Sequence, residues 1–448
     1  MEKDAANSAV RRTVETATRI ARASVARDGR TTSRARLTMG SVREAMLGAR
    51  EAWKKRKGAK EKAKFALHVV RMAAAELVST AQLAPYAARA WWDRQASDVG
   101  PFRRRGKRVR VWKGVPYAAD SQQQRLDVYL PTDANDEDGS TTRTKRPAAL
   151  FVHGGTWSSG CAWHYAPMAR CLAEHGVVVA VADYRLYPNA TMEDMTQDVL
   201  CAMRWTVETA PKIGADPERV AVVGHSAGAH LVAKALLMWD EQTIAMEDRT
   251  KQQQMEANRP SLFVGLAGVY DIQKHYEYEA ERNVHELSTM ARAMGGPSNF
   301  KKHSPALHVM DVLKEHFRKA DTHLPPSKQD VQPAPTPTQK LKLFGEGIAA
   351  RIGLAQPLHW ANTVLPEEPL LRFPPTVLAG SFKDVVVPWY QSAEFALHLH
   401  RAGIPTRQLV YDNVGHGNFV VDWWSSSSAE ELPHHSRDLL ALLQEGAW

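Results

Sequence analysis

The chain has 448 residues, which exceeds the usual size of one domain and leaves room for extensions around a central domain. Its three cysteines, Cys161, Cys171 and Cys201, form no C-x-x-C pair, which argues against a disulfide framework and favours a reducing compartment. The net charge of +9 is unevenly placed, because residues 1–115 hold 28 Lys and Arg against 10 Asp and Glu.

The first 60 residues are predicted to be a basic tail. The stretch from Met1 to about Arg50 is rich in Arg, Ser, Thr and Ala and poor in acids. This composition is typical of a disordered or loosely helical tail, and also of an organellar transit peptide. Such a charge favours an anionic partner, and a membrane surface fits better than nucleic acid, because no nucleic-acid-binding motif accompanies the charge.

Residues 61–107 are predicted to be an amphipathic helical segment. A Lys-rich run, Lys54–Lys64, precedes the apolar stretch Phe65–Trp92, which we expect to form one long helix. Arg71 and Glu76 interrupt this stretch, so it lacks the roughly 18 uncharged residues that a transmembrane helix needs. Two interpretations remain open, a cap over an active site and a helix lying on a membrane surface.

Residues 108–448 show the alternation of short apolar runs and helical patterns that is typical of an α/β domain. The pattern predicts a doubly wound, mostly parallel sheet with helices on both faces. In such sheets ligands bind at the carboxyl ends of the strands. The predicted strands are Ala148–Val152, Val177–Ala182, Val220–Val223, Leu262–Leu266, Thr376–Ala379 and Gln408–Tyr411.

The sequence GHSAG, Gly224–Gly228, directly follows the strand at Val220–Val223 and precedes a helix-forming stretch. A strand, a sharp Gly-x-Ser-x-Gly turn and a helix are the context of a nucleophile elbow, which exposes the serine hydroxyl. The alternative is a glycine-rich turn with a capping serine. We interpret Ser226 as a candidate nucleophile, which then needs a base and an oxyanion hole.

The sequence HGGTW, which begins at His153, directly follows the strand at Ala148–Val152. Its two glycines, Gly154 and Gly155, let backbone N–H groups point into a site with no side chain in the way. Together with the N–H of Ala227 they are the candidate oxyanion hole. Trp157 is a candidate substrate contact, although a large aromatic residue here can equally belong to the core.

Two later loops supply the remaining partners. Asp384 follows the strand at Thr376–Ala379, and His416 stands between two glycines after the strand at Gln408–Tyr411. The chain order Ser226, Asp384, His416 is the order of an α/β-hydrolase triad. The alternatives are a helix-capping role for Asp384 and a loop histidine at position 416. The sequence therefore predicts a serine hydrolase.

These motifs resemble those of the HGG-type α/β-hydrolases. Together with DYRLYP at Asp183–Pro188, GVYDI at Gly268–Ile272 and the entry QQQRLDVYLP at Gln122–Pro131, they are most similar to the isoprenylcysteine methylesterase-like proteins. The resemblance covers roughly residues 109–422. It implies an α/β-hydrolase fold and hydrolysis of a carboxyl methyl ester on a prenylated cysteine. It also implies an association with the cytosolic face of the endoplasmic reticulum or Golgi.

Alternatives stay open beside this interpretation. Another small ester or N-formylkynurenine could be the substrate, or the chain could be a scaffold on a hydrolase fold. Organellar import and the cytosol are the alternative locations. No cofactor is expected, because the triad chemistry needs none, and His164, Cys161 and Cys171 do not form a zinc motif.

A Pro-rich insertion is predicted at about residues 312–372. Its most distinctive part is LPPSKQDVQPAPTPT at Leu324–Thr338, followed by a short helix expected at Leu341–Leu354. Insertions of this length tend to be lids or disordered segments. A second, Gln-rich surface insertion is predicted around Gln252–Gln254.

Overall fold

The computed structural model describes residues 46–82, 84–95, 108–132, 145–321, 365–423 and 428–446. The predicted basic tail up to residue 45 lies outside the described residues. So do the Pro-rich part of the insertion and the short helix expected at Leu341–Leu354.

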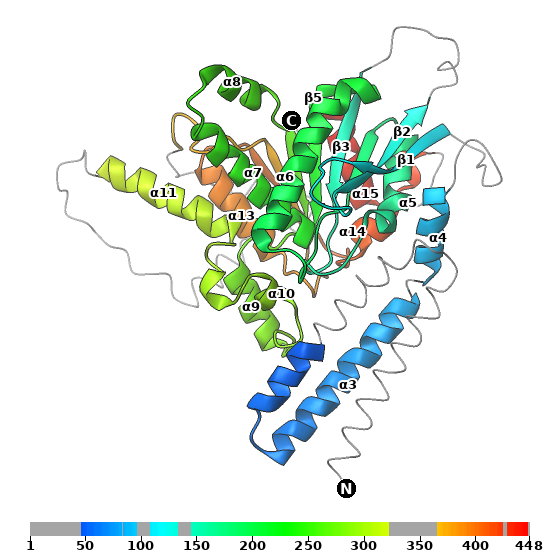
Figure 1. The fold of residues 1–448 in the computed structure, drawn as a ribbon, viewed down its shortest axis with the longest axis vertical. Coiled ribbons are helices and arrows are strands. Elements are labelled where there is room, and N and C mark those ends of the chain that lie inside the picture. Colours follow the sequence, from blue (N-terminus) through cyan, green and yellow to red (C-terminus); the bar gives the residue numbers. More distant parts are fainter. Residues whose placement is uncertain are drawn as a thin grey trace.

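The described residues form one eight-stranded sheet with the strand order β1-β2-β4-β3-β5-β6-β7-β8 (Figure 1). The pairs β1–β2 and β2–β4 are antiparallel, and every pair from β4 to β8 is parallel. The strands are β1 Arg108–Pro116, β2 Arg125–Thr132, β3 Arg146–Val152, β4 Val178–Ala182, β5 Ala215–His225, β6 Leu262–Leu266, β7 Thr376–Ser381 and β8 Thr406–Tyr411.

The central strands are mostly apolar because both of their faces are covered. Every residue of β4, β6 and β7 is buried, as parallel strands between two helical layers require. All six predicted strands are present, and the prediction of a doubly wound, mostly parallel sheet is confirmed.

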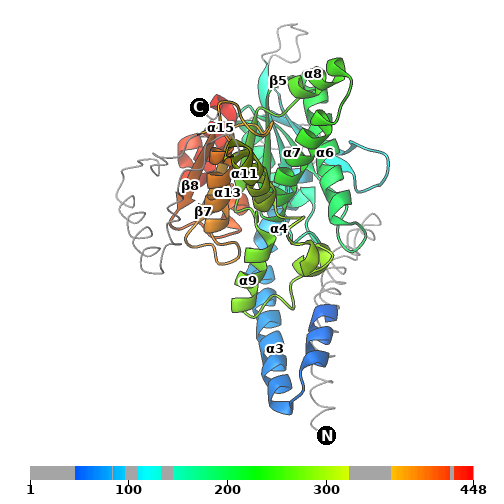
Figure 2. The same cartoon turned by 90° about the vertical axis from the view of Figure 1, so that its left-hand side faces the viewer.

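Helices cover both faces of the sheet (Figures 1 and 2). The sheet separates two clusters of buried residues, one on each face. On one face lie α6 (Met192–Thr209), α7 (Ala227–Ile244) and α13 (Tyr390–Arg401), and on the other lie α5 (Ala166–Glu174) and α15 (His434–Glu445). The remaining body helices are α8 Arg249–Ala257, α9 Ile272–Glu281, α10 Met290–Ala293, α11 Pro305–Asp321 and α14 Asn418–Val421, with 3₁₀ turns at Ala162–Tyr165, Ala210–Ile213, Pro297–Asn299 and Ala429–Glu431.

An N-terminal helical segment, residues 46–95, projects from this body beside α9 (Figure 2). It contains a helix at 46–55, α3 (Ala59–Gln82) and α4 (Ala84–Gln95). The prediction of one helix over Phe65–Trp92 was wrong, since the structure has two helices there, α3 ending at Gln82 and α4 beginning at Ala84. The physical reason is Pro85, whose ring clashes with the carbonyl four residues earlier and which has no N–H to donate.

Helix α4 is fixed to the body by buried polar contacts. The Tyr86 hydroxyl donates to the carbonyl of His164 at 2.7 Å. Arg94 pairs with Asp127 of β2 through two nitrogens, and its Nη2 lies 3.0 Å from Asp127 Oδ1. Bidentate pairs of this kind add both energy and direction, so α4 is held against the antiparallel edge of the sheet.

The rest of the N-terminal helical segment contacts the chain between α9 and α10. Arg56 Nη2 lies 2.6 Å from Glu286 Oε2, and His68 Nε2 lies 2.9 Å from the carbonyl of Asn283. In the part of the chain that the structure describes, no helix is both long and apolar enough to cross a membrane. The choice between a cap and a membrane-surface helix stays a prediction.

Candidate active site

Ser226 lies at the sharp turn between β5 and α7 and has a left-handed backbone, with φ 53° and ψ −122°. Its N–H donates to the carbonyl of Leu266 at 2.9 Å, and its carbonyl accepts the N–H of Ala229 at 3.0 Å. A Cβ at Gly224 would lie 2.5 Å from Ala229 Cα, and one at Gly228 would lie 2.1 Å from a backbone oxygen. Glycine is therefore required on both sides of the serine, as the elbow pattern predicts.

The structure brings Asp384 and His416 into contact from two loops. His416 Nδ1 lies 2.7 Å from Asp384 Oδ2, and the Asp384 side chain is completely buried. Asp384 Oδ1 also accepts the backbone N–H groups of Val386 and Val387, at 2.8 and 2.9 Å. One carboxylate oxygen therefore fixes the turn at Val386 and Val387, while the other faces the imidazole. Helix α13 begins only at Tyr390 and has no side-chain cap, so Asp384 does not cap it.

His416 is also held close to the elbow by the residue that precedes the serine. His225 Nε2 lies 2.9 Å from the carbonyl of His416, and the two rings are 4.8 Å apart. Burial lowers the pKa of His225 to about 3, so the ring is neutral and its Nε2–H donates this bond. His225 thus positions the backbone of the candidate base.

The HGG loop packs directly against the elbow. A Cβ at Gly154 would lie 3.0 Å from Ser226 Cβ, so only glycine allows this approach. The N–H of Gly154, however, donates to the Tyr165 hydroxyl at 3.2 Å. Ala227 is the first residue of α7, where backbone N–H groups point away from the helix. The oxyanion roles of Gly154, Gly155 and Ala227 stay predictions, and Gly154 already has a partner for its N–H.

Trp157 is buried, with 2% of its surface exposed. Its indole N–H donates to His230 Nδ1 at 3.1 Å, and His230 Nε2 in turn lies 2.7 Å from the carbonyl of His303. Burial lowers the pKa of His230 to about 3, so the ring is neutral and serves as a fixed acceptor for the indole. These contacts give Trp157 a packing role, and its contact with substrate stays a prediction.

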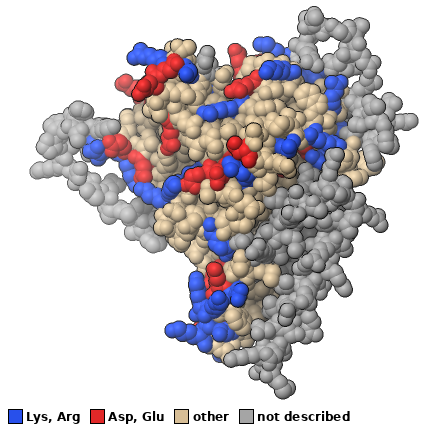
Figure 3. Space-filling model, in the orientation of Figure 1, with Lys and Arg blue, Asp and Glu red and all other residues tan. Residues whose placement is uncertain are grey.

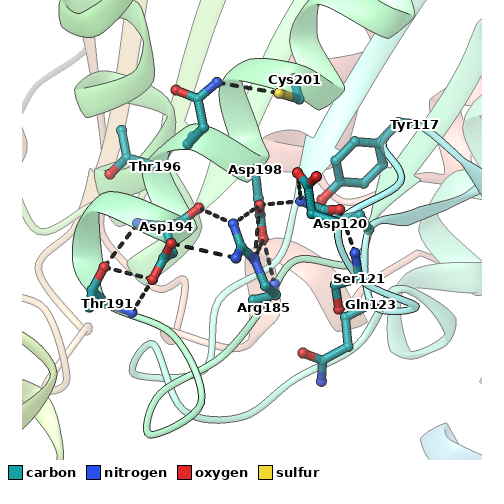
Figure 4. Close-up of polar contacts among 12 residues, drawn as sticks. Tyr117, Asp120, Ser121, Gln123, Arg185, Thr191, Asp194, Thr196, Asp198 and Cys201 are labelled. Atoms are coloured by element: carbon teal, nitrogen blue, oxygen red, sulfur yellow. Dashed lines mark hydrogen bonds and ion pairs between the residues drawn. The ribbon is translucent and has the colours of Figure 1, made fainter.

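A buried ion pair supports the chain that leads away from β4 (Figure 4). Arg185 Nη2 lies 2.7 Å from Asp198 Oδ1, and the backbone N–H of Arg185 donates to Asp198 Oδ2 at 2.9 Å. Gln124 Nε2 donates to the same carboxylate at 2.7 Å. Asp198 on α6 is fully buried and accepts hydrogen bonds from both residues, which gives it a structural role.

Helix α9 places two further titratable side chains in the interior. His275 Nε2 lies 3.8 Å from Glu279 Oε1, which also accepts the Ser288 hydroxyl at 2.9 Å. Burial raises the pKa of Glu279 to about 7 and lowers that of His275 to about 4. The Tyr278 hydroxyl of α9 donates to the carbonyl of Val385 at 2.9 Å, which places α9 beside the loop that carries Asp384. Glu279 belongs to none of the motifs that the sequence shows.

The comparisons with known proteins agree with this geometry. Residues 126–315 match the family model described as BD-FAE. The chain is 33% identical over 195 residues to a probable isoprenylcysteine alpha-carbonyl methylesterase of Oryza sativa subsp. japonica, which covers 44% of each chain. It is 31% identical over 221 residues to the isoprenylcysteine alpha-carbonyl methylesterase of Arabidopsis thaliana, covering 48% of this chain and 47% of that protein. The chain thus spans less than half the length of these relatives.

A solved structure extends the likeness of the fold beyond the matched region. Esterase B from Lactobacillus rhamnosis (HN001) superposes with a TM-score of 0.51 at 17% identity, covering 83% of this chain and 93% of that chain. The predicted resemblance to HGG-type hydrolases and to the isoprenylcysteine methylesterase-like proteins is confirmed as a similarity of sequence and fold. Residues 126–315 are therefore similar to the BD-FAE family, and the chain has an α/β-hydrolase fold.

Proposed function

We propose that this protein is a serine carboxylesterase that hydrolyses a carboxyl methyl ester of a prenylated cysteine. The observation that carries the proposal is the contact of 2.7 Å between His416 Nδ1 and the buried carboxylate of Asp384. That imidazole is anchored beside the elbow that presents Ser226. An acid, a base and a strained serine in this arrangement are what acyl transfer needs.

In the proposed mechanism Ser226 Oγ attacks the ester carbonyl while its proton passes to His416 Nε2. Asp384 holds the Nδ1–H tautomer and stabilises the imidazolium that forms. The oxyanion is stabilised by the N–H groups of Gly155 and Ala227. His416 then gives its proton to the departing methoxide, and methanol leaves. Water attacks the acyl-enzyme with the same base, which releases the acid and restores Ser226.

Two kinds of observation support the choice of substrate. The curated relatives are named as isoprenylcysteine methylesterases. In addition, the loop around Asp384 exposes Phe382, Val385 and Val386, which have 42%, 62% and 42% of their surface exposed. Apolar side chains beside the acid of the triad suit an acyl group that carries a prenyl chain.

The charge of the N-terminal helical segment supports a proposed contact with an anionic membrane surface. Residues 54–64 contain seven Lys and Arg against a single acid, Glu61. Figure 3 shows Lys and Arg gathered at the tip of this segment, on the side where α9 lies. A basic tip of this kind would bring the active site toward a lipid-borne substrate on the cytosolic face of the endoplasmic reticulum or Golgi. Organellar import and the cytosol are the alternatives.

The test is a comparison of three substrates with wild-type protein and Ser226→Ala. These are a farnesylcysteine methyl ester, a short p-nitrophenyl ester and N-formylkynurenine. The proposal predicts the highest kcat/KM on the farnesylated ester and its loss in Ser226→Ala. Activity confined to the short ester or to N-formylkynurenine would overturn the substrate assignment. No activity on any of them would favour a scaffold on a hydrolase fold.

A further inference from the structure

The loop that follows β3 contains two successive non-glycine residues in the left-handed region. Thr156 has φ 48° and Trp157 has φ 58°, directly after Gly155 with φ 127°. This region crowds the Cβ against the backbone, and it is least favourable for a β-branched residue such as threonine. The conformation therefore persists only because other parts of the protein hold it.

A hydroxyl from a distant segment holds the first of these residues. Thr289, which lies between α9 and α10, donates its hydroxyl proton to the carbonyl of Thr156 at 2.9 Å. The Thr289 hydroxyl has only one proton, and this bond uses it. In the contact of 3.0 Å between Ser158 Oγ and Thr289 Oγ1, Ser158 is therefore the donor. Thr289 and Ser158 are buried, so no water competes easily for these bonds.

The neighbouring carbonyls of the loop are held in the same way. The carbonyl of Gly155 accepts the N–H of Ser159 at 2.9 Å, and that of Trp157 accepts the N–H of Tyr187 at 2.9 Å. In a planar trans peptide the N–H points opposite to the carbonyl. Fixing these carbonyls therefore fixes the direction of the N–H groups that follow them, and the course of the loop on both sides of Thr156.

We propose that Thr289 is a positioning residue for the oxyanion loop. Its hydroxyl holds Thr156 in the left-handed conformation and so keeps the neighbouring Gly155 in place, with its N–H directed at the carbonyl oxygen of the ester that Ser226 attacks. The inference rests on the proposed function, because it assigns to the loop the oxyanion-binding role given above. Thr289 itself lies behind the loop and touches no reacting atom.

The experiment compares Thr289→Val, Thr289→Ser and wild type in steady-state hydrolysis of the preferred ester. Valine keeps the shape and removes the hydroxyl, and serine restores the hydroxyl. We expect Thr289→Val to lower kcat by about 30-fold with KM changed by less than about 3-fold, since oxyanion binding acts in the transition state. Thr289→Ser should recover kcat to within about 3-fold of wild type.

The matched control is Thr206→Val. Thr206 is also a buried threonine whose hydroxyl donates to a backbone carbonyl, that of Ala202 at 2.7 Å, but it lies within α6. It should leave kcat unchanged. A Thr289→Val variant with wild-type kcat, or a Thr289→Ser variant as slow as Thr289→Val, would overturn the proposal. Equal losses in Thr206→Val and Thr289→Val would overturn it too.

A second readout separates this proposal from the proposed function. In protein labelled with ¹⁵N-glycine, the Gly155 amide resonance should shift in Thr289→Val and return in Thr289→Ser, whether or not an ester is hydrolysed. If Thr289→Val fails to fold, Ser158→Ala removes the donor to Thr289 and should shift the same resonance. A Gly155 resonance that does not move in Thr289→Val would refute the positioning role of Thr289. A resonance that moves in a protein inactive on every ester would refute only the proposed esterase activity.

Discussion

Replacing Ser226 by glycine should abolish hydrolysis and at the same time stabilise the fold. The backbone of Ser226, with φ 53° and ψ −122°, is strained for any residue with a Cβ, at a cost of order 1–3 kcal/mol. Hydrogen bonds to Leu266, Ala229 and His230 hold this conformation in place. Glycine adopts this conformation without strain, but it lowers the free energy of unfolding by about 0.5–1 kcal/mol because it makes the unfolded chain more flexible. The expected net gain is therefore about 1 kcal/mol relative to Ser226→Ala.

Ser226→Ala is the matched reference, because alanine keeps the Cβ and removes the hydroxyl. Urea unfolding of both variants measures the difference, which should appear as a higher midpoint for Ser226→Gly at an unchanged slope. Both variants should be inactive. A glycine variant that unfolds at a lower urea concentration than the alanine variant would refute the claim that the elbow stores strain.

Three further changes test other parts of the structure. Asp198→Asn removes the buried charge that faces the partly exposed guanidinium of Arg185 and should cost about 3 kcal/mol in urea unfolding, whereas the exposed Asp194→Asn should cost about 1 kcal/mol. Equal costs would contradict the assignment of a buried ion pair. Glu279 has a pKa of about 7 in the folded protein, above its usual value of 4.5. Its protonated form therefore stabilises the fold fully below pH 4.5, and this stabilisation is lost as the pH rises through about 7. Thermal unfolding should therefore show a loss of up to about 3 kcal/mol between about pH 5 and about pH 8 that is absent in Glu279→Gln. Tyr86→Phe removes the hydrogen bond from α4 to the body and should lower the local stability by about 1 kcal/mol. Proteolytic cleavage within α3 should therefore become several-fold faster. An unchanged cleavage rate would show that α4 is held by other contacts.

The sheet could be predicted from the sequence because most of its parallel strands contain a short apolar run that both helical layers bury. The elbow could be predicted for a similar local reason, since Gly224 and Gly228 are demanded by contacts within a few residues of Ser226 and by the strand beside it. Asp384 and His416 followed from the order of loops along the chain, and the structure places them 2.7 Å apart.

What could not be predicted depends on contacts between distant segments. The bond from Thr289 to Thr156 and the pairing of Gly154 with Tyr165 leave no local pattern in the sequence, because hydroxyls are common and their partners are set by packing. By contrast, the helical form of the Gln-rich piece, α8, follows from a local property, the high helix propensity of glutamine and lysine. Burial of Glu279, which raises its pKa, likewise follows from tertiary packing alone.

The central claim is that Ser226 is an activated nucleophile, and its reaction with a fluorophosphonate probe measures this most directly. Intact-mass analysis and peptide mapping should find one adduct, on the peptide that contains Ser226. The adduct should be absent in Ser226→Ala and should form at least about 100-fold more slowly in His416→Ala, which lacks the base. An unlabelled wild-type protein, or an adduct on another residue, would contradict the account.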